Sequence, residues 1–182
     1  TSINGVHLRK KEGVLATNLD TLSFEVNDLN YSNTKGEMSS IEKVESHLAA
    51  IHLEQKNDEA LKIAFHDFNL SVNSAGYRGK ENREADIEVM KTGFERADLI
   101  IDKTFRGDIK KVYLIVNDTA FANSEIKATL STLNQTLDTF ILRYREGESE
   151  MHFYDLITAF DDLYYGDRRN VLKLNSVGVN LL

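Results

Sequence analysis

The chain contains no cysteine, which excludes a disulfide, a thiolate metal site and a cysteine nucleophile. It also contains no proline, although an average soluble chain of this length carries about nine. Glycines such as Gly36, Gly76, Gly107 and Gly147 fall between the apolar segments, and nothing inside those segments forbids a helix. No apolar run approaches the roughly 20 residues that a membrane-spanning helix needs, so we expect no membrane span.

The composition is that of a globular protein, with 41% hydrophobic and 28% charged residues among 182. The net charge of −7 disfavours long-range attraction to nucleic acid or to anionic lipid. The length predicts a single domain over residues 1–182. Because the sequence starts at Thr1, we expect it to be a fragment or a processed form of a longer chain.

Most of the chain carries apolar residues at helical spacing, which predicts helices over 40–56, 81–106, 124–145 and 150–165. In the first of these segments, Ser39 to Glu42 fit a capping box. The segment 124–145 is close to a heptad seam, and its short link to 150–165 favours an antiparallel helical hairpin.

Two segments, 14–31 and 59–74, fit either element type. Leu15, Leu19 and Leu22 lie on one helical face, whereas Leu22, Phe24 and Val26 alternate as in a strand. Helix is the favoured interpretation of both segments. The segment 109–117 is the best strand candidate, and the head 3–8 and the tail 170–182 are weaker ones that could pair with it.

These patterns together predict a mainly α fold, with a single helical domain of five to six helices and a small β-sheet or hairpin. We find no internal repeat in the sequence and no linker that marks a domain boundary.

No motif for catalysis, for a cofactor or for a metal stands out. The histidines share no helical face at a ligand spacing, and there is no HExxH or ExxH motif; they are His7, His47, His52, His66 and His152. The glycine-bounded segment 76–80 lacks the spacing of a phosphate loop. We therefore assign no catalytic, cofactor-binding or metal-binding residue and expect no cofactor.

One pair of residues suggests an enzyme. Arg145 and His152 are separated by six residues at the junction of two expected helices. This arrangement resembles HEPN-type RNases, small helical proteins that carry an Arg, a gap of four to six residues and a His. The resemblance implies that the two residues bind phosphate and assist attack by the ribose 2′-hydroxyl. Glu146 and Gly147 depart from the family's pattern.

The main functional hypothesis is a non-enzymatic protein–protein interaction or self-assembling structural module, acidic and α-helical. Its partner would be another protein or a second copy of the chain. It is based on the lack of a catalytic signature and on tyrosines near element ends, such as Tyr31 and Tyr77. The alternatives are a HEPN-like helical ribonuclease and, if the alternating segments are strands, a protein with a lipid-binding groove.

Overall fold

The structure is a computed structural model of residues 1–182, and it describes all of them except residues 12, 58 and 182. The described residues form nine β-strands and no helix, so the predicted mainly α fold is wrong. The strands are β1 (Ser2–Lys11), β2 (Val14–Ser32), β3 (Met38–Lys56), β4 (Leu61–Arg78), β5 (Glu84–Ile101), β6 (Phe105–Ala122), β7 (Lys127–Arg145), β8 (Glu148–Gly166) and β9 (Val171–Leu181).

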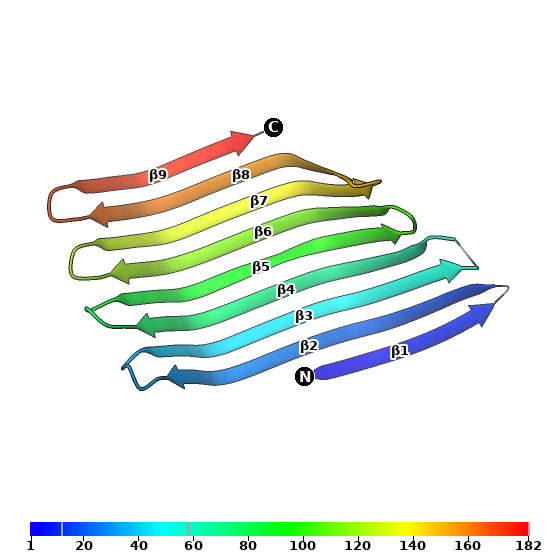
Figure 1. Ribbon diagram of the computed structural model, residues 1–182, viewed down its shortest axis with the longest axis horizontal. Coiled ribbons are helices and arrows are strands. Elements are labelled where there is room, and N and C mark those ends of the chain that lie inside the picture. The colour runs from blue at the N-terminus through cyan, green and yellow to red at the C-terminus, as the bar shows by residue number, and fades with distance from the viewer. Residues whose placement is uncertain (12, 58, 182) are drawn as a thin grey trace.

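The strands form one open antiparallel sheet in which each strand pairs with the next one along the chain (Figure 1). The seven inner strands have 18 or 19 residues, whereas the edge strands β1 and β9 have 10 and 11. Side chains close several of the tight turns that connect the strands. For example, the Asn33 side-chain oxygen accepts hydrogen bonds from the amides of Lys35 and Glu37, at 2.9 and 3.1 Å.

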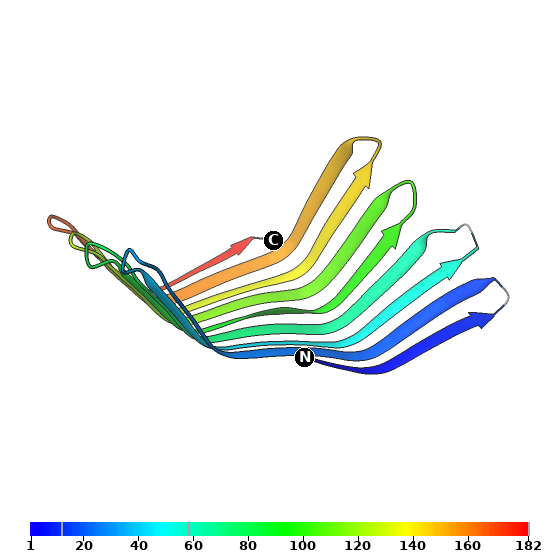
Figure 2. The same cartoon turned by 60° about the horizontal axis from the view of Figure 1, so that its bottom comes forward.

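The sheet bends twice and has the shape of a trough, with a floor and two walls (Figure 2). Each long strand runs from one wall across the floor to the other wall. At the first bend, Asp67, Lys111 and Asp155 have positive φ. At the second bend the positive-φ residues are Asp28, Ser74, Asp118 and Asp162. The strand pairing is interrupted at both bends and resumes in the same register. A left-handed residue at such an interruption bends the strand locally, although it adds no extra residue relative to the neighbouring strand as a β-bulge would.

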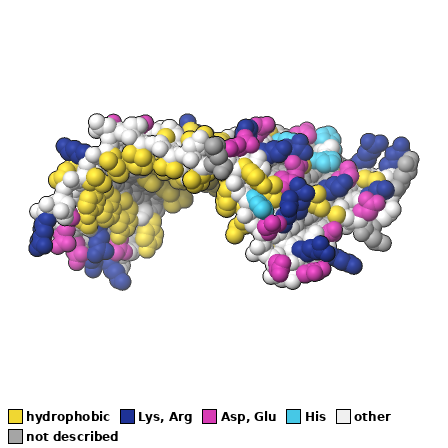
Figure 3. Space-filling model, turned by 90° about the horizontal axis from the view of Figure 1, so that it is seen from above, with side chains coloured by type: hydrophobic (Ala, Val, Ile, Leu, Met, Phe, Trp, Pro, Cys, Tyr) yellow, Lys and Arg dark blue, Asp and Glu magenta, His cyan; other side chains and the backbone are white. Residues whose placement is uncertain are grey.

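Between the bends the side chains alternate, and one face of the sheet is apolar. We call this surface the groove face. In β2 it consists of Leu15, Thr17, Leu19, Leu22, Phe24, Val26, Leu29 and Tyr31. The register places the residues opposite these on the groove face of β3, and so on to β9. Figure 3 shows hydrophobic side chains lining the hollow of the trough at the end where β2 and β3 are connected.

The bends reveal an internal repeat, which corrects the expectation that there is none. The positive-φ residues Asp28, Ser74, Asp118 and Asp162 follow one another at intervals of 46, 44 and 44 residues. Each interval is one pair of strands. The residues before the first three of these positions are similar, as Phe24–Asp28 (FEVND), Leu70–Ser74 (LSVNS) and Leu114–Asp118 (LIVND) show. The fold is therefore a hairpin repeated along the sheet.

The sheet is a single layer and has almost no enclosed core. Leu48 and Ala97 are the only buried hydrophobic side chains among the described residues. The accessible surface is 12391 Å², whereas a compact protein of 20.7 kDa exposes about 8,900 Å². A sheet with one apolar face normally packs that face against a second layer. Here no second layer is present among the described residues.

The predicted helices at 40–56, 81–106, 124–145 and 150–165 are all strand segments, and so are the ambiguous segments 14–31 and 59–74. Strand 109–117 is confirmed within β6, and the head and the tail lie in β1 and β9. These three do not pair with one another, because they are separated in the strand order. The link at 146–147 does connect antiparallel neighbours, β7 and β8, but they are strands.

Candidate functional site

The groove face is the candidate site because it is continuous and uncharged. Over the described parts of β2–β9, no Asp, Glu, Lys, Arg or His occupies it. Its polar members are hydroxyl or amide side chains such as Ser46, Thr92 and Gln135. Lys10 on the edge strand β1 is the one charged exception in the described rows. The face therefore offers contact to hydrocarbon with no charge to bury.

The trough floor carries an apolar row close to the second bend. One row of directly opposed residues crosses eight strands and contains Val26, Val44, Val72, Met90, Val116, Leu133, Phe160 and Val177. Aromatic pairs lie near the first bend, where the rings of Phe68 and Phe94 stack at 5.3 Å and those of Phe140 and Phe153 lie 5.0 Å apart. Such cross-strand contacts hold the sheet together in place of a second layer.

The trough has a definite direction and size. Because the bends run from strand to strand, the axis of the trough runs along the strand order from β1 to β9. Eight spacings of about 4.8 Å make it about 38 Å long. An inner strand of 18 residues follows the trough wall for about 60 Å from rim to rim.

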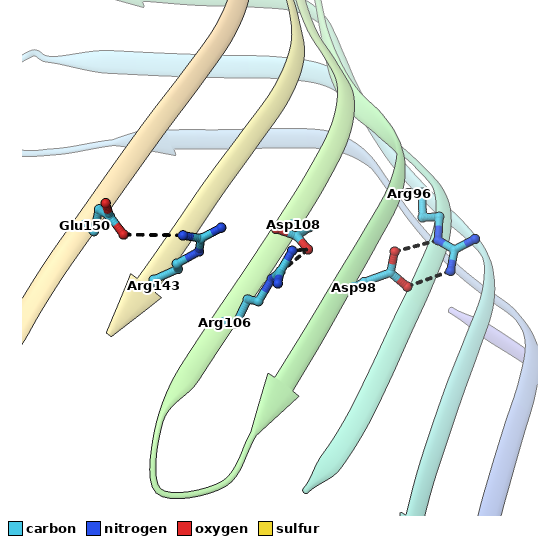
Figure 4. Close-up of polar contacts among 6 residues, drawn as sticks. All are labelled: Arg96, Asp98, Arg106, Asp108, Arg143 and Glu150. Carbon is cyan, nitrogen blue, oxygen red and sulfur yellow. Dashed lines mark hydrogen bonds and ion pairs between the residues drawn. The ribbon is translucent and has the colours of Figure 1, made fainter. Parts of the chain in front are cut away.

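The opposite face is polar and carries ion pairs. Figure 4 shows a line of them across β5–β8. Arg96 donates two hydrogen bonds to Asp98, at 2.6 and 2.8 Å. Arg106 pairs with Asp108 at 2.8 Å, and Arg143 lies 3.6 Å from Glu150. All of these groups face solvent in part, so each pair contributes little to stability.

Two opposed glutamates on the polar face share one lysine. Glu25 and Glu45 lie directly opposite each other, and the Lys43 ammonium is 3.5 Å from the first carboxylate and 2.5 Å from the second. The hydrogen bond from Asn27 and the charge of Lys43 lower the pKa of Glu25, while the bond to Glu45 raises the pKa of Lys43. The lysine therefore removes the repulsion that opposed like charges would cause.

The histidines lie apart on the sheet, on β1, β3, β4 and β8. Their contacts are local ones, such as that of His47 with the Ser23 hydroxyl at 3.0 Å. Among the residues that the structure describes, no group of three or more histidine and carboxylate side chains is arranged to hold a metal ion. The absence of a metal and of a cofactor stays a prediction.

The ribonuclease hypothesis loses its helical framework. Arg145 ends β7 opposite Glu148, whereas His152 lies four residues further along β8, opposite Ile141. Four residues of strand separate their backbones by about 13 Å. Each side chain contacts a nearby glutamate instead, Glu146 at 3.6 Å for Arg145 and Glu150 at 2.9 Å for His152.

The predicted α-helical interaction or self-assembly module is also wrong, because the helices on which it depends are strands. The hypothesis of a lipid-binding groove requires the alternating segments to be strands. These segments, including 22–26 and 61–65, are strands. The described residues contain no helix that is long and apolar enough to cross a membrane.

Comparisons with known proteins identify no relative. No family model, no curated protein and no solved structure matches the chain.

Proposed function

We propose that this protein binds lipids by their acyl chains, which lie against the groove face. The observation that carries the proposal is the uncharged apolar surface that crosses β2–β9 without a covering layer. Soluble monomers rarely expose an apolar patch larger than a few hundred Å², and larger ones mark interaction sites. Hydrocarbon is the occupant that such a surface suits best, since it brings no polar group that needs a partner.

The distribution of polar groups supports lipid over a folded protein partner. Interfaces between proteins normally combine an apolar centre with charged and hydrogen-bonding groups at the rim. Here the charges of β2–β9 lie on the other face and in the turns, as the pairs Arg96–Asp98 and Arg106–Asp108 illustrate. A lipid needs no polar partner within the trough, because its headgroup remains in water above the open side.

The size and charge of the protein narrow the class of lipid. One leaflet of a bilayer is about 15 Å thick, half of the hydrocarbon core, so acyl chains of ordinary length fit within a trough about 38 Å long. Over the described residues of β2–β9 the groove face holds no cation to bind a phosphate, and the net charge of −7 repels anionic surfaces. We therefore propose zwitterionic or neutral lipids with two ordinary acyl chains.

Adjacent residues of β6 provide a matched test. Val116 lies on the groove face in the apolar row close to the second bend, and its neighbour Ile115 lies on the polar face; both side chains are half-buried. We expect Val116→Lys to weaken binding of a fluorescent phosphatidylcholine at least tenfold, because acyl chains would have to contact an ammonium. Ile115→Lys should bind like the wild type.

Folding of both variants is checked by circular dichroism and denaturant melts. If Val116→Lys does not fold, Val116→Thr replaces it, since it adds one hydroxyl without changing the shape of the side chain. Equal lipid binding by the wild type and a folded groove-face variant, or no binding by the wild type, contradicts the proposal.

A further inference from the structure

The two edge strands cover opposite halves of the sheet's edges. β1 pairs with residues 14–23 of β2, and none of the described residues pairs with Phe24–Ser32 on that side. At the other edge, β9 pairs with residues 156–166 of β8, and the outer side of Glu148–Asp155 has no partner in the described chain. Unpaired strand edges of this kind are templates for another strand.

The two half-edges are complementary in shape. A row here is the set of directly opposed residues that crosses the sheet from strand to strand. The residues of β9 lie in the same rows as Leu22–Ser32 of β2, and those of β1 lie in the same rows as Val14–Ser23. A second copy moved along the trough by eight strand spacings, about 38 Å, brings its β1 beside the open half of β8. The same movement brings β9 of the first copy beside the open half of β2 in the second. Both new pairs are antiparallel, because odd strands run opposite to even ones.

The side chains that meet in this arrangement match on the groove face. Val6 and Leu8 of one copy lie opposite Phe153 and Met151 of the other, by the same register. These four are among the most exposed hydrophobic side chains of the described sheet, 66%, 74%, 59% and 59% accessible, respectively. At the other half, Leu172 and Val179 lie opposite Tyr31 and Phe24, which are also exposed.

The polar face matches in charge. Arg9 of one copy lies in the row of Glu150 of the other. On the remaining half, Lys173 faces Asn30, and Glu25 faces Gly178, so neither pair sets like charges against each other. Opposed charges across strands stabilise pairing and like charges weaken it.

We propose that a second copy of this chain joins the sheet edge to edge, with β1 of one copy beside β8 of the other and β9 beside β2. The joint continues the groove face from one copy into the next. In the joint, Ser2 and Ile3 of one copy would occupy the same positions as Asn180 and Leu181 of the other. The two end residues of one of these strands therefore leave the sheet. The joint depends on edge pairing and not on bound lipid.

Cysteine cross-linking tests the register directly, because the chain has no cysteine of its own. Leu8→Cys in one copy and Met151→Cys in a size-tagged copy are mixed and mildly oxidised. Within one chain these positions lie seven strands apart, about 34 Å, so a disulfide can form only between copies. We expect a mixed dimer from this pair. The control pair, Leu8→Cys with Leu172→Cys, should not cross-link because the two residues lie in different rows.

A charge variant gives a second test that leaves the groove unchanged. We expect Arg9→Glu to weaken self-association about fivefold in sedimentation experiments at 0.15 M salt, and Lys103→Glu, in the turn between β5 and β6, to have no effect. Lipid binding is measured on the same samples and should not change. Absence of the mixed disulfide, equal yield from the control pair, or disulfides between two copies of Leu8→Cys overturns the proposed joint, whatever the lipid result.

Discussion

Leu133 and Phe160 lie directly opposite each other on β7 and β8, side by side on the groove face. Both are half-buried, although each belongs to the apolar row of the trough floor. The pair shows how this sheet differs from an ordinary domain. Its apolar residues touch their neighbours across the strands, and the side toward the trough remains free for another molecule.

Truncation of either residue should therefore cost less than truncation of a core residue. We expect Leu133→Ala and Phe160→Ala each to lower the free energy of unfolding by about 1 kcal/mol, instead of the 2–5 kcal/mol typical of an enclosed core. Both should also weaken lipid binding. Denaturant melts that give about 3 kcal/mol or more for both variants would indicate that a second layer covers this row.

The sequence misleads because the bends recur every seven residues. On the groove face of β7, the steps between successive residues are two, three, two, two and three, from Ala128 to Phe140. Leu130, Leu133, Leu137, Phe140 and Tyr144 then form a subset with heptad spacing, which is the pattern of a helix. Leu15, Leu19, Leu22, Val26 and Leu29 of β2 do the same. A strand whose alternation skips one residue at each bend thus imitates helical periodicity.

The signal that could have identified the fold is the repeat of about 44 residues, with a short polar residue at the same place in each copy. Single-segment periodicity cannot reveal it. The strand at 109–117 could be predicted because its middle is β-branched and apolar on both faces. The groove face could not be predicted from single residues, since it exists only when nine strands are aligned.

Asp118 tests the bends. Its φ is 46°, in the left-handed region that Asn, Asp and Gly tolerate and β-branched residues do not. We expect Asp118→Val to lower the free energy of unfolding by about 1–2 kcal/mol, and Asp118→Asn to have little effect. The measurement is a pair of denaturant melts. Equal stability of the two variants would mean that the backbone at this bend is extended.

Gly93 tests the close packing on the polar face. The Tyr113 hydroxyl donates a hydrogen bond to the Asn69 side-chain oxygen across it. A Cβ at Gly93 would lie 2.1 Å from the Phe68 carbonyl oxygen and 2.8 Å from the tyrosine hydroxyl. Gly93→Ala should therefore destabilise the sheet by about 1–3 kcal/mol.

The matched control for this variant is Gly178→Ala in β9, where a Cβ would meet no atom within 4 Å. Its unfolding free energy should equal that of the wild type or slightly exceed it. Similar losses in the two variants would refute the packing of Tyr113 over Gly93.

Two aspartates in turns make the folding stability of the protein sensitive to acid. Hydrogen bonds from the Thr104 amide and hydroxyl lower the pKa of Asp102, and those from the amides of Arg169 and Asn170 lower the pKa of Asp167. Both values fall below the ordinary 3.8. Because the folded pKa is depressed, this stability is present above pH 3.8 and is lost as the pH falls through the folded values.

Asparagine in place of these aspartates should preserve the hydrogen bonds of the turns and remove the titratable carboxyl groups. Asn33 and Asn123 already accept the equivalent amide hydrogen bonds in other turns. We expect the double variant Asp102→Asn, Asp167→Asn to lose less stability than the wild type between about pH 4 and pH 2. Thermal melts across that range provide the measurement, and parallel curves for the two proteins would contradict the assignment.

Contact between acyl chains and the groove face can be tested by cross-linking with a phosphatidylcholine that carries a photoactivatable group on its acyl chain. We expect that, after digestion, the modified residues lie on the groove face of the inner strands, such as Val72, Met90 and Val116. Neighbours on the polar face, such as Asn73 and Ile115, should remain unmodified. Equal modification of both faces, or none above the level seen with a water-soluble photoactivatable reagent, would contradict the proposal that acyl chains lie against the groove face.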